Sequence, residues 1–273
     1  MIRVRKYGEV TDFCMGRTIG PVVPYAVHAF LIGDTLIDTG TVYAQEEFLD
    51  ALKGSSLSTI INTHHHEDHI GNNLALHNAF GASIHAHEKA LPFLADPKAI
   101  GLKAYQRIVW GLPEKSQGQA LDSRISCAGR TFDVIYTPGH SPDHVCLFNP
   151  DTGWLFTGDI FCGRTVRYLR RDEDFSLTLS SLKRLAELDV TTLFCSLKGI
   201  VEDGKAALEA KISFMERLAA EVLELKESGY PPCRIRRKIL GREDAMYYLS
   251  TAHFSKEHVI ESILFPAAGC PSD

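Results

Sequence analysis

Thr63-His64-His65-His66-Glu67-Asp68-His69-Ile70-Gly71 is the stretch of the chain that says most about its fold. Four of the twelve histidines lie here within six consecutive positions, together with two acids. The β-branched run 57–62 before it predicts a buried strand, and residues 70–76 after it predict the start of a helix. The cluster is therefore expected on a strand-to-helix turn at the carboxyl end of a strand, where open α/β sheets place their ligands.

The spacing within this stretch predicts a metal site. Residues two apart in an extended segment point the same way, so His64 and His66 can face one point while His65 faces away. Asp68 and His69 follow at the helix start and can face a second point close by. Imidazole and carboxylate together suit zinc, iron or manganese. The internal position between apolar segments favours a metal site over a solvated polar loop.

Composition limits the classes of partner. Charged residues make up 23% and hydrophobic residues 45% of the 273 residues, as in ordinary globular proteins. The net charge of −5 gives no reason to expect nucleic acid or a membrane as partner, which leaves a small-molecule substrate. No stretch resembles a signal peptide or reaches membrane-spanning length. The oligomeric state stays open, a homodimer included.

Cysteine usage indicates the compartment. The chain has seven cysteines, an odd number, and they are scattered without any Cys-x-x-Cys pair. This pattern favours free thiols in a reducing environment, so a cytoplasmic location is expected. Cys146 and Cys195 lie in apolar runs and are expected in the core.

Further polar residues follow other predicted strands. The strand 132–137 leads into a loop rich in glycine and proline that fixes His140, and the strand 154–157 ends at Asp159. Asp38 ends the strand 35–38, where it either bonds the metal loop or caps a turn. His85 and His87 alternate on the strand 81–86 and its end, but no acid accompanies them, so a position on a sheet face is favoured.

The rest of the chain suggests a catalytic domain over residues 1–228 and a helical extension over 229–273. Residues 93–125 interrupt the strand-rich pattern and suggest an insertion over the site, with Tyr105 and Trp110 as candidate wall residues. The apolar repeat within 202–228 predicts a long helix that packs on the core.

Together these pieces resemble the metallo-β-lactamase superfamily, in particular its glyoxalase II-like and lactonase-like members. The matching residues are Leu36-Ile37-Asp38-Thr39-Gly40, the His64-x-His66-x-Asp68-His69 loop, Thr137-Pro138-Gly139-His140 and Thr157-Gly158-Asp159. The resemblance implies an α/β fold, a four-layer αββα sandwich with metals at one sheet edge. It also implies that His64, His66 and His140 hold one metal, that Asp68 and His69 hold a second, and that Asp159 bridges both. His144 would stand behind the ligands.

One departure concerns Lys198, which stands where family members usually carry a last histidine ligand. A protonated lysine cannot ligate a metal. We therefore expect one tightly bound zinc and a weaker or empty second site, with iron or manganese as alternatives. His253 could fold back to fill the gap. Lys198 could instead bind a substrate carboxylate or replace part of the missing charge.

Three functions are compatible with these residues. The first is hydrolysis of an ester, thioester, lactone or amide by metal-activated hydroxide, with Asp68 orienting the nucleophile and carrying a proton, and Lys198 assisting. The second is a mononuclear iron enzyme like the family's persulfide dioxygenases, with His64, His140 and Asp159 around the iron. The third is a non-catalytic member that binds a metal or a small molecule. Arg164 and Arg167 allow an anionic substrate without requiring one.

Overall fold

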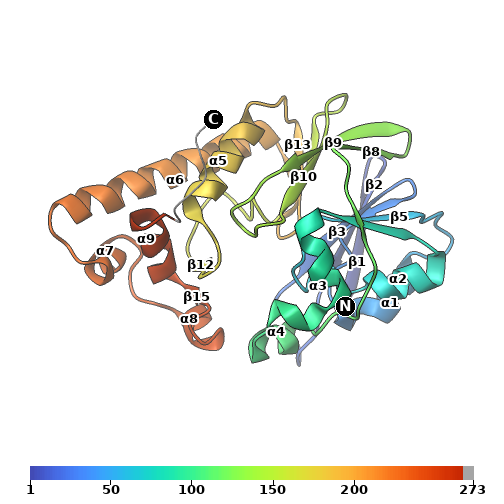
Figure 1. Ribbon diagram of the computed structural model, residues 1–273, viewed down its shortest axis with the longest axis horizontal. Coiled ribbons are helices and arrows are strands. Elements are labelled where there is room, and N and C mark those ends of the chain that lie inside the picture. Colours follow the sequence, from blue (N-terminus) through green and yellow to red (C-terminus); the bar gives the residue numbers. More distant parts are fainter. Residues whose placement is uncertain (267–273) are drawn as a thin grey trace.

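A computed structural model describes residues 1–266 of the 273-residue chain. Two mixed sheets pack face to face, and helices cover both outer faces (Figure 1). The predicted four-layer αββα sandwich with a helical C-terminal region is confirmed. None of the helices within residues 1–266 has the length and apolar character that crossing a bilayer requires.

The first sheet contains the metal loop. Its strands lie side by side in chain order, antiparallel from β1 to β4 and parallel from β4 to β7. Helices α1 (Gln45–Ala51), α2 (Asn73–Phe80) and α3 (Leu91–Ala95) cover its outer face. The strands are β1 (Ile2–Tyr7), β2 (Val10–Met15), β3 (Val27–Ile32), β4 (Thr35–Ile37), β5 (Thr59–Asn62), β6 (Ser83–Ala86) and β7 (Gln119–Ala120).

The second sheet has the strand order β14-β13-β11-β10-β9-β8. Only β11 and β13 run parallel, and α5 (Phe175–Ala186) connects them. Helices α5 and α6 (Gly204–Glu227) cover its outer face. The strands are β8 (Arg124–Cys127), β9 (Arg130–Tyr136), β10 (Val145–Asn149), β11 (Trp154–Gly158), β13 (Thr192–Cys195) and β14 (Gly199–Glu202).

An aromatic layer joins the two sheets. Phe30 of β3 lies with its ring centroid 5.6 Å from that of Phe156 and 5.5 Å from that of Phe194. Successive residues of β11 alternate as a strand requires: Phe156 belongs to this inner layer, whereas Leu155 packs outward with α5 and α6. The sandwich therefore has separate cores on both sides of the second sheet, and the strand ends are held at fixed positions.

The C-terminal helices return to the side of the sandwich that carries the metal loop. They are α7 (Pro232–Ile239), α8 (Ala245–Leu249) and α9 (Lys256–Leu264). The short strand β15 (Phe254–Ser255) pairs antiparallel with β12 (Leu169–Arg170), which follows the loop after β11. Val259 and Ile260 of α9 pack in the same cluster as the apolar side chains of α5 and α6. The extension thus lies against the domain as far as residue 266, while Cys270 lies outside the described residues.

The predicted insertion 93–125 contains only short helical pieces between residues 97 and 110. A 3₁₀ turn (Pro97–Ile100) and Gly101 precede α4 (Ala104–Val109). Gly101 has a left-handed φ of 71° and interrupts the helix there, and Gly111 with φ 84° ends the segment.

Candidate metal centre

Three loops at one edge of the sandwich bring the predicted ligands together. They are the β5–α2 loop with the histidine cluster, the β9–β10 loop with His140, and the end of β11 with Asp159. Two groups of ligand atoms, each within 4.8 Å of one another, could hold a metal ion: His64, His66 and His140 form one, and His64, His69 and Asp159 form the other. His64 is common to both.

The buried polar atoms of this site fit a cation. Nε2 of His64, Nε2 of His69 and Oδ1 of Asp159 are buried and have no hydrogen-bond partner within residues 1–266. A buried polar atom without a partner destabilises a fold by roughly 1–3 kcal/mol. Two imidazole nitrogens and a carboxylate oxygen are ligands that zinc and similar ions prefer, so an ion among them would satisfy all three.

Asp68 lies beside these groups without belonging to either. Its Oδ1 is 3.8 Å from Nε2 of His69. Burial raises the pKa of Asp68 to about 7, against the opposing effect of His69. Asp159 behaves differently: burial also works against its charge, but His69 and His140 beside it hold its pKa well below the usual range. The two carboxyl groups therefore differ in proton affinity.

Asp38 holds the metal loop from the neighbouring strand end. Its Oδ2 lies 2.8 Å from Nδ1 of His69, and its Oδ1 accepts a 2.8 Å hydrogen bond from the backbone N–H of Thr63. Thr63 Oγ1 in turn lies 3.0 Å from Nδ1 of His64. Of the two roles considered for Asp38, the bond to the metal loop is therefore the one that forms. These contacts leave Nε2 of both histidines free to face a metal.

His144 and His65 stand behind the candidate ligands. His144 Nδ1 lies 2.8 Å from Thr137 Oγ1, and its Nε2 accepts a 3.1 Å hydrogen bond from the backbone N–H of Asp159. Burial lowers the pKa of His144 to about 3, so the ring is neutral and positions Asp159. His65 faces away, as the strand alternation predicted: its Nδ1 is 2.8 Å from Asp143, and its ring stacks on Phe93.

Two site residues were missed by the sequence analysis. Glu173 Oε1 lies 2.8 Å from Nδ1 of His140, so Nε2 of that ring faces the metal loop, 3.0 Å from Nδ1 of His66. The buried guanidinium of Arg170 lies against the His66 ring, with Nη2 3.0 Å from Nδ1. Arg170 lies in β12, which pairs with β15, and Glu173 follows three residues later; no local pattern in the sequence indicates that pairing.

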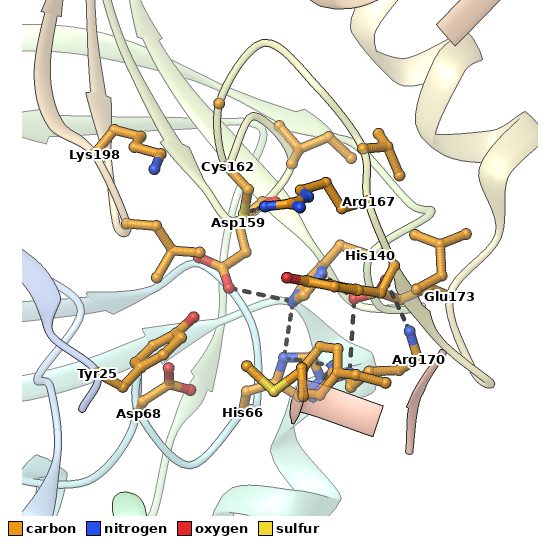
Figure 2. A pocket seen from close by; sticks show the side chains of 18 of the residues that line it. Tyr25, His66, Asp68, His140, Asp159, Cys162, Arg167, Arg170, Glu173 and Lys198 are labelled. Carbon is orange, nitrogen blue, oxygen red and sulfur yellow. Dashed lines mark hydrogen bonds and ion pairs between the residues drawn. The ribbon is translucent and has the colours of Figure 1, made fainter. Parts of the chain in front are cut away.

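A cavity of about 830 Å³ opens on the site, and His66, Asp68, His140 and Asp159 form part of its wall. Figure 2 shows Tyr25, Asp68 and His66 on one side of the cavity and Lys198, Cys162 and Arg167 on the other. Much of the remaining wall comes from residues 105–110 of the insertion, residues 160–170, and the C-terminal extension.

The insertion is attached to both neighbouring parts of the site. Gln106 Nε2 donates a 2.8 Å hydrogen bond to Oε1 of Glu67 in the metal loop. Tyr105 Oη lies 2.6 Å from Nδ1 of His253 in the C-terminal extension. Tyr105 and Trp110 line the cavity, as their position in the insertion suggested.

Neither Lys198 nor His253 completes a ligand group. Lys198 follows β13, is exposed and lines the cavity. His253 is engaged by Tyr105 and belongs to neither ligand group, so it does not fill the place of a missing histidine. His85 and His87 also lie outside both groups.

The comparisons with known proteins agree with this geometry. Residues 22–196 match the model of the metallo-beta-lactamase superfamily. The hydroxyacylglutathione hydrolase of Rhizobium meliloti (strain 1021) is 31% identical over 203 residues, which cover 70% of each chain. The hydroxyacylglutathione hydrolase of Synechococcus sp. (strain JA-3-3Ab) is 28% identical and covers 68% of this chain and 69% of its own.

Solved structures share the fold over nearly the whole chain. A beta-lactamase domain protein from Burkholderia ambifaria superposes with a TM-score of 0.72 at 17% identity, covering 97% of this chain and 88% of that one. A metallo-beta-lactamase family protein from Thermus thermophilus superposes with a TM-score of 0.67 at 20% identity, covering 93% and 92%.

The two-sheet sandwich, the ligand groups at its strand ends and the hydroxyacylglutathione hydrolases among the relatives together support a metal-dependent hydrolase. Since the family model spans residues 22–196 of the 273, the chain belongs to the metallo-β-lactamase superfamily, and hydroxyacylglutathione hydrolases are among its relatives.

Proposed function

We propose that the protein is a zinc-dependent hydrolase that cleaves an ester-type carbonyl bond, preferentially a thioester, of a small molecule. One observation carries the proposal: two groups of potential ligands share His64, and His66, His140 and Asp159 from these groups face a cavity large enough for a substrate. Two of the relatives are hydroxyacylglutathione hydrolases, and for this reason we propose a thioester rather than a lactone or an amide.

The first ligand group, His64, His66 and His140, would hold one ion. His69 of the second group would hold another ion together with Asp68, which lies beside that group, and Asp159 would contribute to both. Bound zinc lowers the pKa of a coordinated water towards about 7 and polarises a carbonyl oxygen. Because Lys198 stands where a further ligand is expected, we propose that the second ion is held more weakly than the first.

The chain's own residues transfer the protons and position the metal ligands. Asp68 lines the cavity, so its carboxylate can take a proton from the nucleophile and return it to the leaving group. Asp38 and Glu173 fix the rings of His69 and His140 through their Nδ1 atoms. Lys198 lines the cavity, and we propose that it holds an anionic part of the substrate.

Elemental analysis of protein purified without chelator, followed by thioester, lactone and persulfide assays, tests the proposal. We expect one tightly bound zinc per chain, a second that dialysis removes, and thioester hydrolysis. His64→Ala and His140→Ala should lose metal and activity while the circular dichroism spectrum stays native.

Other results would point elsewhere. Bound iron together with oxygen consumption on a persulfide would identify the oxidative alternative. Metal binding without turnover on any ester or thioester would identify a binding protein. Hydrolysis by a metal-free His64→Ala, His140→Ala double variant would refute a metal-dependent mechanism altogether.

A further inference from the structure

The mouth of the cavity has an exposed apolar rim, defined here as Ile19, Ile108 and Leu249. These side chains are 40%, 54% and 71% exposed, and all three line the cavity. They come from three distant segments: the loop after β2, α4 and α8. Large apolar side chains that gather around a cavity mouth mark a binding surface rather than random surface composition.

The wall below the rim is also apolar. Tyr25 and Trp110 pack edge to face with their ring centroids 4.9 Å apart, and Met246 and Phe254 continue the wall from the C-terminal extension. A cavity of about 830 Å³ is at the large end for small-molecule sites. A short polar acyl group would leave much of this surface in contact with water, whereas a long apolar chain would cover it.

The far side of the cavity carries a cation wall, defined here as Lys198, Lys211 and Arg167. Lys211 of α6 is only 4% exposed, and its Nζ donates a hydrogen bond to the carbonyl of Phe161. An ammonium has three donors, and that carbonyl is the one acceptor found for it within residues 1–266. The amine therefore has donors left for a ligand in the cavity that it lines.

Lys198 also lies close to the turn that contains Phe161 and Gly163. Its Cε lies 3.1 Å from the position that a Cβ on Gly163 would take, two residues after the carbonyl that Lys211 contacts. Within residues 1–266, no carboxylate lies within 4.0 Å of the charged nitrogens of Lys198, Lys211 or Arg167. Burial lowers the pKa of Lys211, an effect that a bound anion would oppose. Glu173 and Asp159 act on Lys211 from beyond ion-pair distance, so the three cations keep charge that can attract an anionic group.

We propose that the substrate is an anionic amphiphile: a thioester or ester with a long apolar acyl chain lying along the apolar rim and an anionic leaving part held by Lys198 and Lys211. The position of the scissile bond between them rests on the proposed function. In the reaction, water adds to the acyl carbon, the carbon–sulfur or carbon–oxygen bond breaks, and the leaving group takes the proton. The products are a long-chain carboxylic acid and an anionic thiol or alcohol.

Binding can be tested without turnover on the metal-loaded protein. The probe is 3-(dodecylthio)propanoate, a thioether that cannot be hydrolysed, compared by calorimetry with its neutral amide and with the S-ethyl analogue. We expect up to about fourfold tighter binding for each added methylene that the cavity buries. The anion should bind about fivefold more tightly than the amide. Equal affinity for all three probes would overturn the proposal.

Matched variants assign the two parts of the cavity. Lys198→Gln should weaken binding of the anion about fivefold and leave the amide unchanged. Lys205→Gln, at a partly exposed lysine of α6 outside the cavity wall, should change neither. Ile108→Asn should weaken the dodecyl probes and not the ethyl one. Val4→Asn is its control, because Val4 is 53% exposed but lies outside the cavity wall. Lys211→Met should weaken binding of the anionic probe more than Lys198→Gln does. If Lys211→Met does not fold, Lys198→Gln alone still tests the proposal.

Kinetics separate this inference from the proposed function. The substrates are thioesters of the anionic 3-mercaptopropanoate and of the neutral N-acetylcysteamine. Their acyl chains run from acetyl to dodecanoyl, so the series compares both the charge of the leaving group and the length of the acyl chain. Hydrolysis that ignores chain length and charge would refute the amphiphile and leave the hydrolase standing. Selective probe binding with no hydrolysis of any thioester would refute the hydrolase and leave the ligand class standing.

Discussion

Nδ1 of His69 lies 2.8 Å from Oδ2 of Asp38, and Asp38 makes this contact from a left-handed backbone with φ 60°. Non-glycine residues rarely adopt this conformation, which destabilises the chain by about 1–3 kcal/mol unless its surroundings enforce it. Here the left-handed backbone of Asp38 places its carboxylate where it can orient a candidate ligand and also accept a hydrogen bond from the backbone N–H of Thr63.

Asp38→Asn is therefore expected to weaken metal binding. The amide keeps the shape of the side chain but carries no charge, so it holds His69 in the ligating tautomer less strongly. Loss of such a partner lowers metal affinity by about 10–100-fold. Competition with a chromogenic chelator measures the change. Asp50→Asn, at an exposed acid of α1, should have the affinity of the unmodified protein, and an unchanged Asp38→Asn would contradict the role.

Glu173→Gln should act in the same way on the first ligand group. Glu173 Oε1 is 2.8 Å from Nδ1 of His140, whereas the neighbouring Asp172 is 62% exposed in its side chain. We expect about tenfold weaker binding of the tighter metal for Glu173→Gln and no change for Asp172→Asn. Isothermal titration with zinc distinguishes them. Equal effects of the two variants would show that general charge, rather than the contact with His140, matters.

Much of the ligand set could be predicted because it is encoded locally. His64, His65 and His66 obey the two-residue period of an extended segment, and glycine fixes the ends of the strands that carry His140 and Asp159. Parallel and antiparallel strands of one sandwich then bring those ends to one edge. Local pattern and global fold agree here, so the sequence is sufficient.

The remainder depends on contacts between distant segments. Arg170 reaches His66 because two residues of β12 pair with two residues of β15, and so short a pairing leaves no periodic signal. Lys211 falls on the buried face of α6 between Leu208 and Met215, where the apolar repeat predicts a hydrophobic residue. Charged residues at positions where the pattern predicts a hydrophobic one are found at functional sites, where the buried charge binds a ligand.

Removal of the metal should lower thermal stability. The buried unpaired atoms of His64, His69 and Asp159 lose their common partner, and a metal present at about 100 times its dissociation constant contributes about 2.7 kcal/mol. For a chain of this length we expect chelation to lower the melting temperature by about 5–10 °C, and added zinc to restore it. His64→Ala should melt at the same temperature with and without zinc. His85→Ala, outside both ligand groups, should keep the zinc-dependent shift.

The pair formed by His28 and Asp12 predicts a pH-dependent contribution to stability away from the metal. Their Nδ1 and Oδ1 atoms are 2.6 Å apart. Burial lowers the pKa of His28, but hydrogen bonds to Asp12 and Cys14 outweigh it and raise the pKa from 6.5 to about 9. Because the pKa is higher in the folded state, the pair stabilises the fold fully below pH 6.5, and this contribution is lost as the pH rises through about 9.

His28→Gln should thus lower the free energy of unfolding by about 2 kcal/mol near pH 6 and by clearly less near pH 9.5. Urea unfolding of both proteins at the two pH values gives the difference. His77→Gln, at an exposed histidine of α2, should show little change at either pH. A His28→Gln effect that grows with pH would mean that the sign of the pKa shift is wrong.

Gly158 ends β11 directly before Asp159, and its replacement should disturb both fold and site. Its φ is 46°, and a Cβ there would lie 2.6 Å from Nε2 of His144 and 2.8 Å from Oγ1 of Thr63, which position Asp159 and His64. Gly158→Ala is therefore expected to lower the free energy of unfolding by about 2–4 kcal/mol and to weaken metal binding. Gly54→Ala is the control for backbone strain alone, because φ is 82° there but no atom lies within 4 Å of the added Cβ. We expect this variant to lose about 1 kcal/mol in the free energy of unfolding and to keep its metal affinity. Urea unfolding and zinc titration of both variants measure the two effects, and equal losses in the two would show that contact with His144 and Thr63 contributes nothing.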